Sequence, residues 1–310
     1  MEMRSESGKR ILPVEPAGGL NKAADMRIAR LSVGGVGRIY FWADGSLWIG
    51  RGIGRAMPHA HHATQVTLSI GSEEETFELH AANAASAALR FALVPAHVRH
   101  VFDGRGGRVA HIFVAPESRE GRALAQRFGK QAIAVLPEQA CAPAAAAMAR
   151  SFFGPRRDAD RIVHAVRSLV RSLAATAEPE PLDPRIAAVR EHVARNVAGK
   201  LALAEAARVV HLSPGRLRHL FMEQTGTTFR AYVVWQRLLR ASAMMMDGAS
   251  WTDAAHAAGF ADSAHLSRSF RRMFGISPGM IVRDEARTAP GAAGIDGAIS
   301  AAAKTAAASD

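Results

Sequence analysis

Residues 251–278 read WTDAAHAAGFADSAHLSRSFRRMFGISP, and this stretch decides the fold of the C-terminal third of the chain. A short alanine-rich segment ends at Gly259, Asp262 or Ser263 can cap a new helix, and apolar residues then follow at helical spacing. Asp and Ser favour helix starts because their side chains accept hydrogen bonds from the first free N–H groups. The stretch therefore predicts two helices joined by a tight turn.

The same pattern occurs once before, displaced by 49 residues. The repeated positions are Leu217, Phe221 and Gly226, which recur with the same spacing as Leu266, Phe270 and Gly275. In the earlier copy, LAEAARVVHLSPGRLRHLF, Ser213 stands at the N-cap position and Pro214 at the first helical position. Because an internal repeat is stronger evidence than a single motif, we expect two helix-turn-helix units.

The segment between the copies, residues 228–246, is apolar at helical spacing and contains no helix breaker. One helix of this length would be about 28 Å long at a rise of about 1.5 Å per residue. Successive major-groove faces of B-DNA lie roughly 34 Å apart. We therefore expect this helix to space the two units so that one chain enters two adjacent grooves.

The second helix of each unit must turn its apolar residues toward the core, so the opposite face determines what it can bind. That face carries Arg216, Arg218 and His219 in the first helix and His265, Ser267, Arg268, Arg271 and Arg272 in the second. These side chains can donate to guanine edges or phosphates, and they lack the glutamate partners typical of a merely solvated helix. A helical bundle with a basic surface explains one such unit, but two units favour recognition of double-stranded DNA.

Residues 183–283 resemble the AraC/XylS family of transcription regulators, most specifically in Gly259–Phe260 and the run from Ser263 to Pro278. The resemblance implies an effector-responsive, sequence-specific DNA-binding regulator. Its implied partners are a small-molecule effector, a second copy of the chain and RNA polymerase. The implied base-facing positions are Gly215, Arg218, His219, Ser263, Ala264, Ser267 and Arg268.

Charge and composition agree with this interpretation. The net charge is +11, and residues 182–283 hold 14 Lys and Arg against 7 Asp and Glu, a net +7 within about a third of the chain. A localised basic domain is the footprint expected of phosphate contacts. The lone Cys141 and the lack of a leader or a membrane-length apolar run predict a cytoplasmic protein that does not cross a membrane.

The whole chain is expected to have an α+β fold with five parts. Residues 1–29 are predicted as a flexible arm, 30–177 as a sensor and dimerisation domain, and 178–184 as a proline-rich linker. Residues 185–283 are predicted as the DNA-binding domain, and 284–310 as a disordered tail. Within the sensor, alternating runs up to about residue 116 predict a small β-sandwich or barrel, followed by helices.

The helical segment 158–173 carries an apolar stripe formed by Ile162, Val163, Val166, Leu169, Val170 and Leu173. A stripe at this spacing packs a helix against an apolar surface. The partner surface is either the helix's own domain or the same helix of a second copy. The sequence does not choose between these alternatives.

The segment PHAHHATQVTLSIG, residues 58–71, places His59, His61 and Gln65 on one side of an extended backbone, and His100 follows later. This set resembles the two cupin motifs, which implies a jelly-roll barrel whose ligand positions hold a divalent metal or an effector. Gln65 stands where the family has glutamate, and a neutral amide binds a cation less well than a carboxylate. We expect these residues to hydrogen-bond an effector or each other, and we expect the neighbouring His62 to lie at the surface.

Two other functions remain open at this point. A cupin metalloenzyme, an oxygenase or isomerase with an appended DNA-binding domain, would need a bound metal, which Gln65 disfavours; we therefore predict no enzymatic activity. A non-specific chromosome-binding protein would bind all duplexes alike with a steep salt dependence. The repeated recognition helices argue against that alternative.

Overall fold

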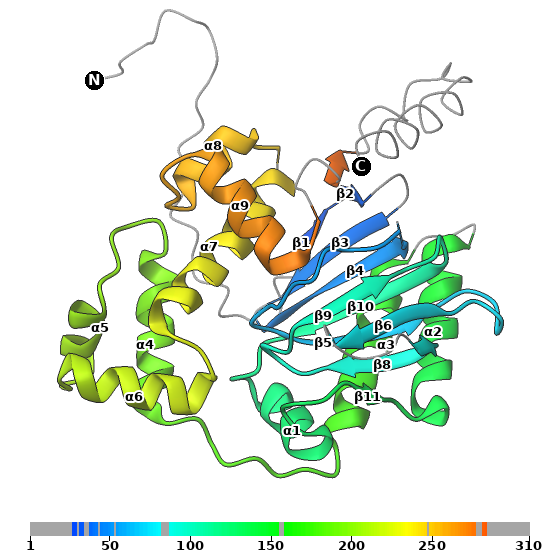
Figure 1. Cartoon of the computed structure of the whole chain (residues 1–310), viewed down its shortest axis with the longest axis horizontal. Helices are drawn as coiled ribbons and strands as arrows, with labels where there is room; N and C mark the ends of the chain where they lie inside the picture. The colour runs from blue at the N-terminus through cyan, green and yellow to red at the C-terminus, as the bar shows by residue number, and fades with distance from the viewer. Residues whose placement is uncertain are drawn as a thin grey trace, which may run out of the picture.

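The computed structural model of the 310-residue chain describes residues 27–29, 31–33, 37–42, 44–52, 54–81, 87–154, 158–246, 248–276 and 281–283. The predicted disordered tail and all but the last residues of the predicted N-terminal arm lie outside this part. Most strands precede most helices along the chain, as in the predicted α+β class, and of the described strands only β11 (Ala134–Val135) and β12 (Ile281–Arg283) follow a helix (Figure 1). No helix within the described ranges is both long enough and apolar enough to cross a bilayer.

The N-terminal part contains antiparallel sheets. The largest has the strand order β1 (Arg27–Ala29), β3 (Gly37–Trp42), β4 (Gly45–Arg51), β10 (Arg108–Val114), β5 (Thr64–Ser69), β8 (Phe91–Val94) and β11 (Ala134–Val135). A smaller sheet has the order β7 (Ala87–Leu89), β6 (Phe77–Ala81) and β9 (His100–Asp103). The last described strand, β12 (Ile281–Arg283), pairs with β2 (Leu31–Val33), so the two ends of the described chain meet.

The alternation of side chains gives the large sheet two different faces. One face bears Leu47, Val66, Leu68 and Ile112, which pack against the helices α1 (Arg119–Phe128), α2 (Glu138–Phe153) and α3 (Ala159–Ala174). On the other face, a cross-strand row runs from Trp48 through His111 to Thr67, because these residues pair directly in the β4–β10–β5 ladder. This second face carries the polar site described below.

The apolar stripe of α3 packs against its own domain. All six of its residues are buried in the same core as the large sheet and α2. The outward positions of α3 instead carry polar residues such as Arg161, His164 and Arg171, which are exposed. Of the two alternatives for this helix, packing within one chain is therefore correct, and the stripe is not available to a second copy.

The C-terminal part is entirely helical up to β12. Its helices are α4 (Pro184–Asn196), α5 (Leu203–Val209), α6 (Pro214–Thr225), α7 (Phe229–Met246), α8 (Trp251–Ala257) and α9 (Ser263–Phe274). The predicted caps are confirmed: Ser213 accepts from the Arg216 N–H, and Asp262 accepts from the His265 N–H. Residues 175–183 between α3 and α4 form neither helix nor strand.

The two helix-turn-helix units are buried in different cores. The first unit, α4 to α6 with the start of α7, has a core of its own around Leu217, Leu220 and Phe221. The second unit, the end of α7 with α8 and α9, shares its core with Trp48 and Phe113 of the large sheet. Figure 1 shows the consequence: α5 and α6 project away from the sheets, whereas α9 runs down to them.

Candidate nucleic-acid interface and sensor cavity

The two recognition helices, α6 and α9, are built alike. Leu217 and Phe221 in α6 and Leu266 and Phe270 in α9 are all fully buried. Each helix ends at a glycine in the left-handed conformation, where a side chain would be strained. The sequence repeat is therefore a structural repeat, and it fixes which face of each helix points away from the core.

The predicted DNA-contacting residues lie on those outer faces. In α6, all four are exposed: Gly215, Arg216, Arg218 and His219. In α9, Ala264, Arg268, Arg271 and Arg272 are exposed, whereas Ser263, His265 and Ser267 are partly buried. The His265 ring packs edge-on against Phe260 at a centroid distance of 5.1 Å, so this side chain is less free than the arginines.

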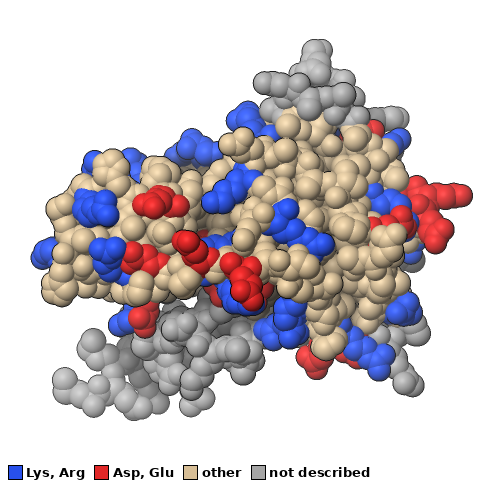
Figure 2. Space-filling view, turned by 90° about the horizontal axis from the view of Figure 1, so that it is seen from below, with Lys and Arg blue, Asp and Glu red and all other residues tan. Residues whose placement is uncertain are grey.

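The arginines of the recognition helices are available for an external anion. Among the described residues, Arg218, Arg268, Arg271 and Arg272 form no ion pair with a carboxylate. Figure 2 shows basic and acidic side chains interspersed over the lobe that contains α4 to α6. The candidate contact points on this face are therefore individual unpaired arginines and not a single broad basic patch.

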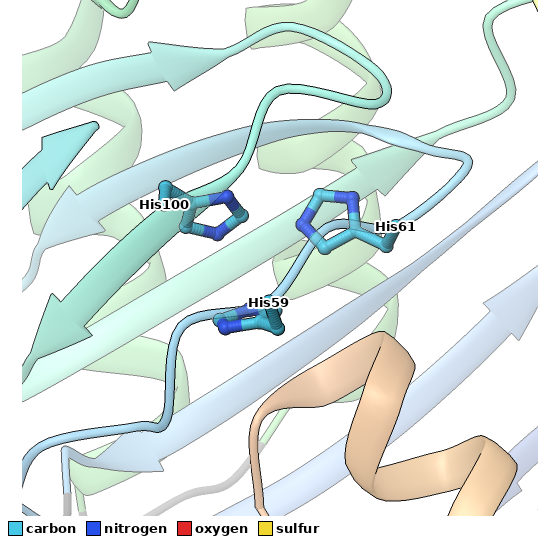
Figure 3. A group of neighbouring side chains, drawn as sticks. All are labelled: His59, His61 and His100. Atoms are coloured by element: carbon cyan, nitrogen blue, oxygen red, sulfur yellow. The ribbon is translucent and has the colours of Figure 1, made fainter. Parts of the chain in front are cut away.

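The predicted histidine cluster is also assembled. His59, His61 and His100 are buried, and one ring nitrogen from each lies within 4.8 Å of the others. Figure 3 shows the three rings facing a common centre from two segments of the N-terminal domain. The sequence prediction that these residues meet is thus supported by the geometry.

Backbone contacts fix the orientation of each ring. The Nδ1 atoms of His59, His61 and His100 lie 2.8, 2.7 and 2.9 Å from the carbonyl oxygens of residues 57, 63 and 98. Burial lowers the pKa of His59 to about 4 and that of His61 and His100 to about 3, so the rings are neutral at pH 7. Each Nδ1 therefore donates to a carbonyl and leaves an Nε2 lone pair for another partner.

Gln65 completes the cluster. Its Oε1 lies 2.8 Å from the His61 Nε2, and its Nε2 lies 2.7 Å from the Thr67 Oγ1. Two acceptors face each other in the His61–Gln65 contact, so either the amide is turned to donate its N–H₂ or a cation lies between them. Ligands about 2.1 Å from a metal and at right angles to each other are about 3.0 Å apart, so the 2.8 Å separation of the His61 Nε2 and the Gln65 Oε1 suits two ligands of one divalent transition metal.

The His100 Nε2 is a further acceptor that the cluster leaves without a partner. This atom is buried and has no hydrogen-bond partner among the described residues. An unsatisfied buried acceptor costs roughly 1–3 kcal/mol unless a water, ligand or ion occupies the position. The cluster can thus accept either a donor group of a small molecule or a metal.

A cavity of about 90 Å³ opens beside this cluster, between the large sheet and the end of α9. Its polar wall is formed by His59, Gln65 and His111. Burial lowers the pKa of His111 to about 3, so this side chain is neutral as well. The remaining wall is mainly apolar and includes Phe274 and Ile276 from the C-terminal part of the chain.

The end of α9 is docked on the histidine cluster. Met57 donates its backbone N–H to the Gly275 carbonyl at 2.9 Å. A side chain at Gly275 would lie 2.6 Å from the His59 Nδ1, which shows how closely the two segments approach. Phe274 packs on Trp48 with ring centroids 4.7 Å apart. The end of α9 and the cavity beside the histidine cluster are therefore in direct contact.

A second contact between the domains is polar. Arg190 of α4 lies 2.9 Å from Asp44 and 3.4 Å from Glu117, and His62 lies 2.9 Å from the other Glu117 oxygen. Burial alone would raise the pKa of Glu117, but its contacts with His62 and Arg190 outweigh it and hold the pKa at about 2. The His62 ring also meets Tyr232 of α7 at 5.4 Å.

Two of these residues were assigned differently from the sequence. The prediction that His62 lies at the surface is wrong, because this side chain is only 3% exposed and pairs with Glu117. His111 was not singled out as a site residue, yet it faces the cavity. The strand register could have revealed His111, since it pairs with Thr67, two residues from Gln65. No local signal indicates that Glu117 meets His62, because 55 residues separate them.

Comparisons with known proteins concern mostly the C-terminal part. Residues 206–284 match the family model described as a helix-turn-helix domain. The chain is 29% identical over 98 residues to the transcriptional activator RhrA of Rhizobium meliloti, covering 30% of this chain and 31% of that protein. It is 38% identical over 73 residues to the transcriptional activator NphR of Rhodococcus, covering 23% and 22%. The matches thus span less than a third of these relatives' length.

Similarity to some solved structures extends over most of the chain. The crystal structure of an apo ToxT variant from Vibrio cholerae superposes with a TM-score of 0.50 at 10% sequence identity. The superposition covers 76% of this chain and 96% of that one. At this identity the likeness concerns the fold alone, namely an N-terminal domain followed by a helix-turn-helix domain.

Proposed function

We infer the function of the whole chain from one premise, namely that its C-terminal third is a helix-turn-helix DNA-binding domain of the AraC/XylS family. We propose that the protein is a sequence-specific transcription regulator and that its N-terminal domain, a cupin-like jelly roll, senses a small molecule. The observation that carries the proposal is the pair of structurally repeated helices with exposed, unpaired arginines.

The distribution of donors indicates how the two helices would share recognition. Arg218 and His219 in α6 and Arg268 in α9 are the candidates for contacts with base edges, since arginine can bond guanine through two N–H groups. Gly215 and Ala264 bring the backbone close to the duplex without adding donors. Arg271 and Arg272, one turn further along α9, are suited to phosphate contacts that fix the position of the helix.

The N-terminal domain supports a sensing role more than a catalytic one. Its polar groups, His59, His61, Gln65 and His100, form a set of neutral donors and acceptors around a small cavity. The three histidines would hold a divalent metal with Gln65 as a fourth, neutral ligand, and the ion would supply a Lewis-acid point for an oxygen atom of an effector. A second copy of the chain and RNA polymerase remain proposed partners.

Selection of binding sites from a random duplex library tests the proposal. We expect selected duplexes to bind at least about 10³-fold more tightly than scrambled ones at physiological salt. The variant Arg268→Ala should reduce this preference by about 1–3 kcal/mol per lost base contact. Arg171→Ala, which removes an exposed arginine from α3 of the sensor domain, is the matched control and should leave the preference unchanged.

Two results would contradict parts of this proposal. Equal affinity of the native chain for all duplexes, with a steep dependence on salt, would indicate non-specific binding. Equal loss of affinity on selected and scrambled duplexes in Arg268→Ala would instead assign Arg268 to a phosphate contact.

A further inference from the structure

The cavity beside the histidine cluster has walls from both parts of the chain. Strands β4 and β10 contribute Trp48 and Phe113, and the end of α9 contributes Phe274 and Ile276. The aromatic side chains of the walls, Trp48, Phe102, Phe113 and Phe274, are buried, so the interior is apolar except at its polar wall. A ligand in this space would touch the sensor domain and the second recognition helix at the same time.

We propose that this cavity binds a small uncharged molecule with a planar apolar body and a hydrogen-bonding group, and that its entry displaces the end of α9. The inference rests on the proposed function, because a displacement of α9 matters for regulation only if α9 contacts DNA. It adds to that function the chemical class of the effector and the element that responds to it.

The absence of buried charge in the walls selects an uncharged ligand. Among the described residues that line the cavity, there is no carboxylate, and the one cationic side chain, Arg51, is exposed at the rim. Burying an ionised group without a partner of opposite charge is far more costly than burying an apolar ring. In the metal-free chain, a cationic or anionic ligand would therefore enter the interior without a buried partner of opposite charge.

Shape and unsatisfied polar atoms select a planar ligand with a polar group. The rings of Trp48, Phe113 and Phe274 surround the space, and aromatic rings prefer stacked or edge-on neighbours. The Trp48 Nε1 is buried and lacks a hydrogen-bond partner among the described residues. An oxygen on the ligand can accept from this indole N–H or exchange hydrogen bonds with His59 and His111.

The size of the cavity makes α9 part of the response. An apolar cavity of about 150 Å³ holds one benzene ring, so a space of about 90 Å³ must expand before a ring enters. Strands β4 and β10 cannot give way easily, because each is hydrogen-bonded on both sides within the large sheet. In the described part of the chain, the segment of Phe274 and Ile276 contacts the cavity-lining strands only through side-chain packing, and it is tied to the N-terminal part by the Met57–Gly275 hydrogen bond and, further along the chain, by the β12–β2 pair. It is not part of the large sheet, so it is the wall that moves.

A movement of this wall changes the position of the second recognition helix. Gly275 directly follows α9, and its carbonyl accepts the Met57 N–H that ties the helix to the sensor. The helix moves as a unit because its own hydrogen bonds make it stiff. A ligand that binds one position of α9 better than another shifts the population toward it and so changes DNA affinity.

Phenol is a suitable probe, and isothermal titration calorimetry measures its binding to the full chain. We expect phenol to bind in the millimolar range or better, and benzoate and benzylammonium to bind at least tenfold more weakly. Ile276→Trp should fill the cavity and weaken phenol binding at least tenfold, whereas Ile276→Ala should enlarge it and tighten binding. Val135→Trp, at an exposed position of β11, is the control and should change nothing.

The second measurement is the affinity for a selected duplex with and without phenol. We expect saturating phenol to change this affinity at least threefold in the native chain and not in Ile276→Trp. The inference would be overturned if phenol did not bind, if a charged analogue bound better, or if phenol binding were unaltered in both Ile276 variants. It would also be overturned if bound phenol left the duplex affinity unchanged. The proposed function fails separately, if the ligand-free chain shows no site preference.

Discussion

Two glycines with the same backbone conformation have different surroundings, and comparing them tests how tightly the end of α9 packs on the N-terminal domain. Gly226 and Gly275 end the two recognition helices with φ values of +71° and +69°. A methyl group at Gly226 would approach His97 at 3.4 Å, an ordinary contact, whereas at Gly275 it would lie 2.5 Å from the Met57 carbonyl oxygen. The strain of the left-handed backbone, about 1 kcal/mol, is common to both positions.

The alanine variants of these glycines should therefore differ. We expect Gly226→Ala to cost about 1 kcal/mol of unfolding free energy and Gly275→Ala at least about 1 kcal/mol more, because α9 must withdraw from the sensor. Urea denaturation measures both values. Equal costs would show that the contact between Gly275 and His59 relaxes freely and does not hold α9 in place.

The buried histidines predict a dependence of stability on pH. The pKa values of His59, His61, His100 and His111 in the folded chain lie at about 3 to 4, below the ordinary value of 6.5. Between these limits the unfolded chain binds more protons, so the contribution of these histidines to the free energy of unfolding is constant only above about pH 7.5 and falls as the pH drops through about 6.5 toward about 4. Glu117, with its pKa of about 2, adds a further loss below about pH 4.5.

A single histidine substitution should change the slope of that dependence. Each such histidine contributes up to about 1.4 kcal/mol per pH unit, so His111→Gln should reduce the slope between pH 6 and 4 by about that amount. His164→Gln, at an exposed position of α3, is the control and should leave the slope unchanged. An unchanged slope in His111→Gln would mean that His111 is protonated in the folded chain at pH 5.

At the scale of elements, the sequence predicted what local rules determine. The caps at Ser213 and Asp262, the helix over residues 229–246 and the burial of the repeated Leu and Phe positions follow from spacing and side-chain chemistry. The placement of His59, His61 and Gln65 on one side of the chain was also predictable from their spacing, whereas His100 was assigned to the cluster by the resemblance to the cupin motifs. The contact of His62 with Glu117 was not predictable, since it depends on how distant elements pack.

The contact between α4 and the N-terminal domain depends on one buried ion pair. Glu117 is 1% exposed, whereas Asp44, the other partner of Arg190, is 46% exposed. A buried charge pair is costly to break, whereas an exposed one contributes about 0–1 kcal/mol. We expect Glu117→Gln to lower the free energy of unfolding by about 1–3 kcal/mol and Asp44→Asn by less than about 1 kcal/mol.

A double-mutant cycle separates the ion pair from other effects of the substitution. Combined with Arg190→Gln, the loss caused by Glu117→Gln should be smaller than in the native chain, because the two residues share one interaction. Chemical denaturation of the four proteins gives the coupling energy. If the two losses of unfolding free energy were fully additive, Arg190 would not stabilise the Glu117 carboxylate, and His62 alone would compensate its charge.

At the scale of the whole molecule, the cores do not follow the sequence boundary. The proline-rich segment before α4 predicts two domains with separate cores, and the first helix-turn-helix unit does have its own. The second unit instead shares a core with the large sheet, through Trp48 and Phe113 on one side and Trp235, Phe270 and Phe274 on the other. The sequence pattern around a residue does not reveal such sharing, because an apolar position has the same spacing whether its own domain or another domain buries it.

The shared core predicts that the sensor and the second unit unfold together. We expect a calorimetric scan of the native chain to show one main transition for these parts, with a smaller or overlapping one for the first unit. Trp48→Ala removes the ring that packs on Phe270 and Phe274, which should cost about 3–5 kcal/mol and separate the unfolding of α8 and α9 from that of the sheets.

Trp42→Ala provides the matched comparison for this prediction. Trp42 packs on the core between the large sheet and α2 and α3, so its loss should lower the melting temperature without adding a transition. If Trp48→Ala also melts in one step with unchanged cooperativity, the aromatic contact does not join the two parts. The appearance of a separate transition in Trp48→Ala would identify this aromatic contact as the one that couples the N-terminal domain to α9, and the proposed displacement of α9 by a ligand requires such a coupling.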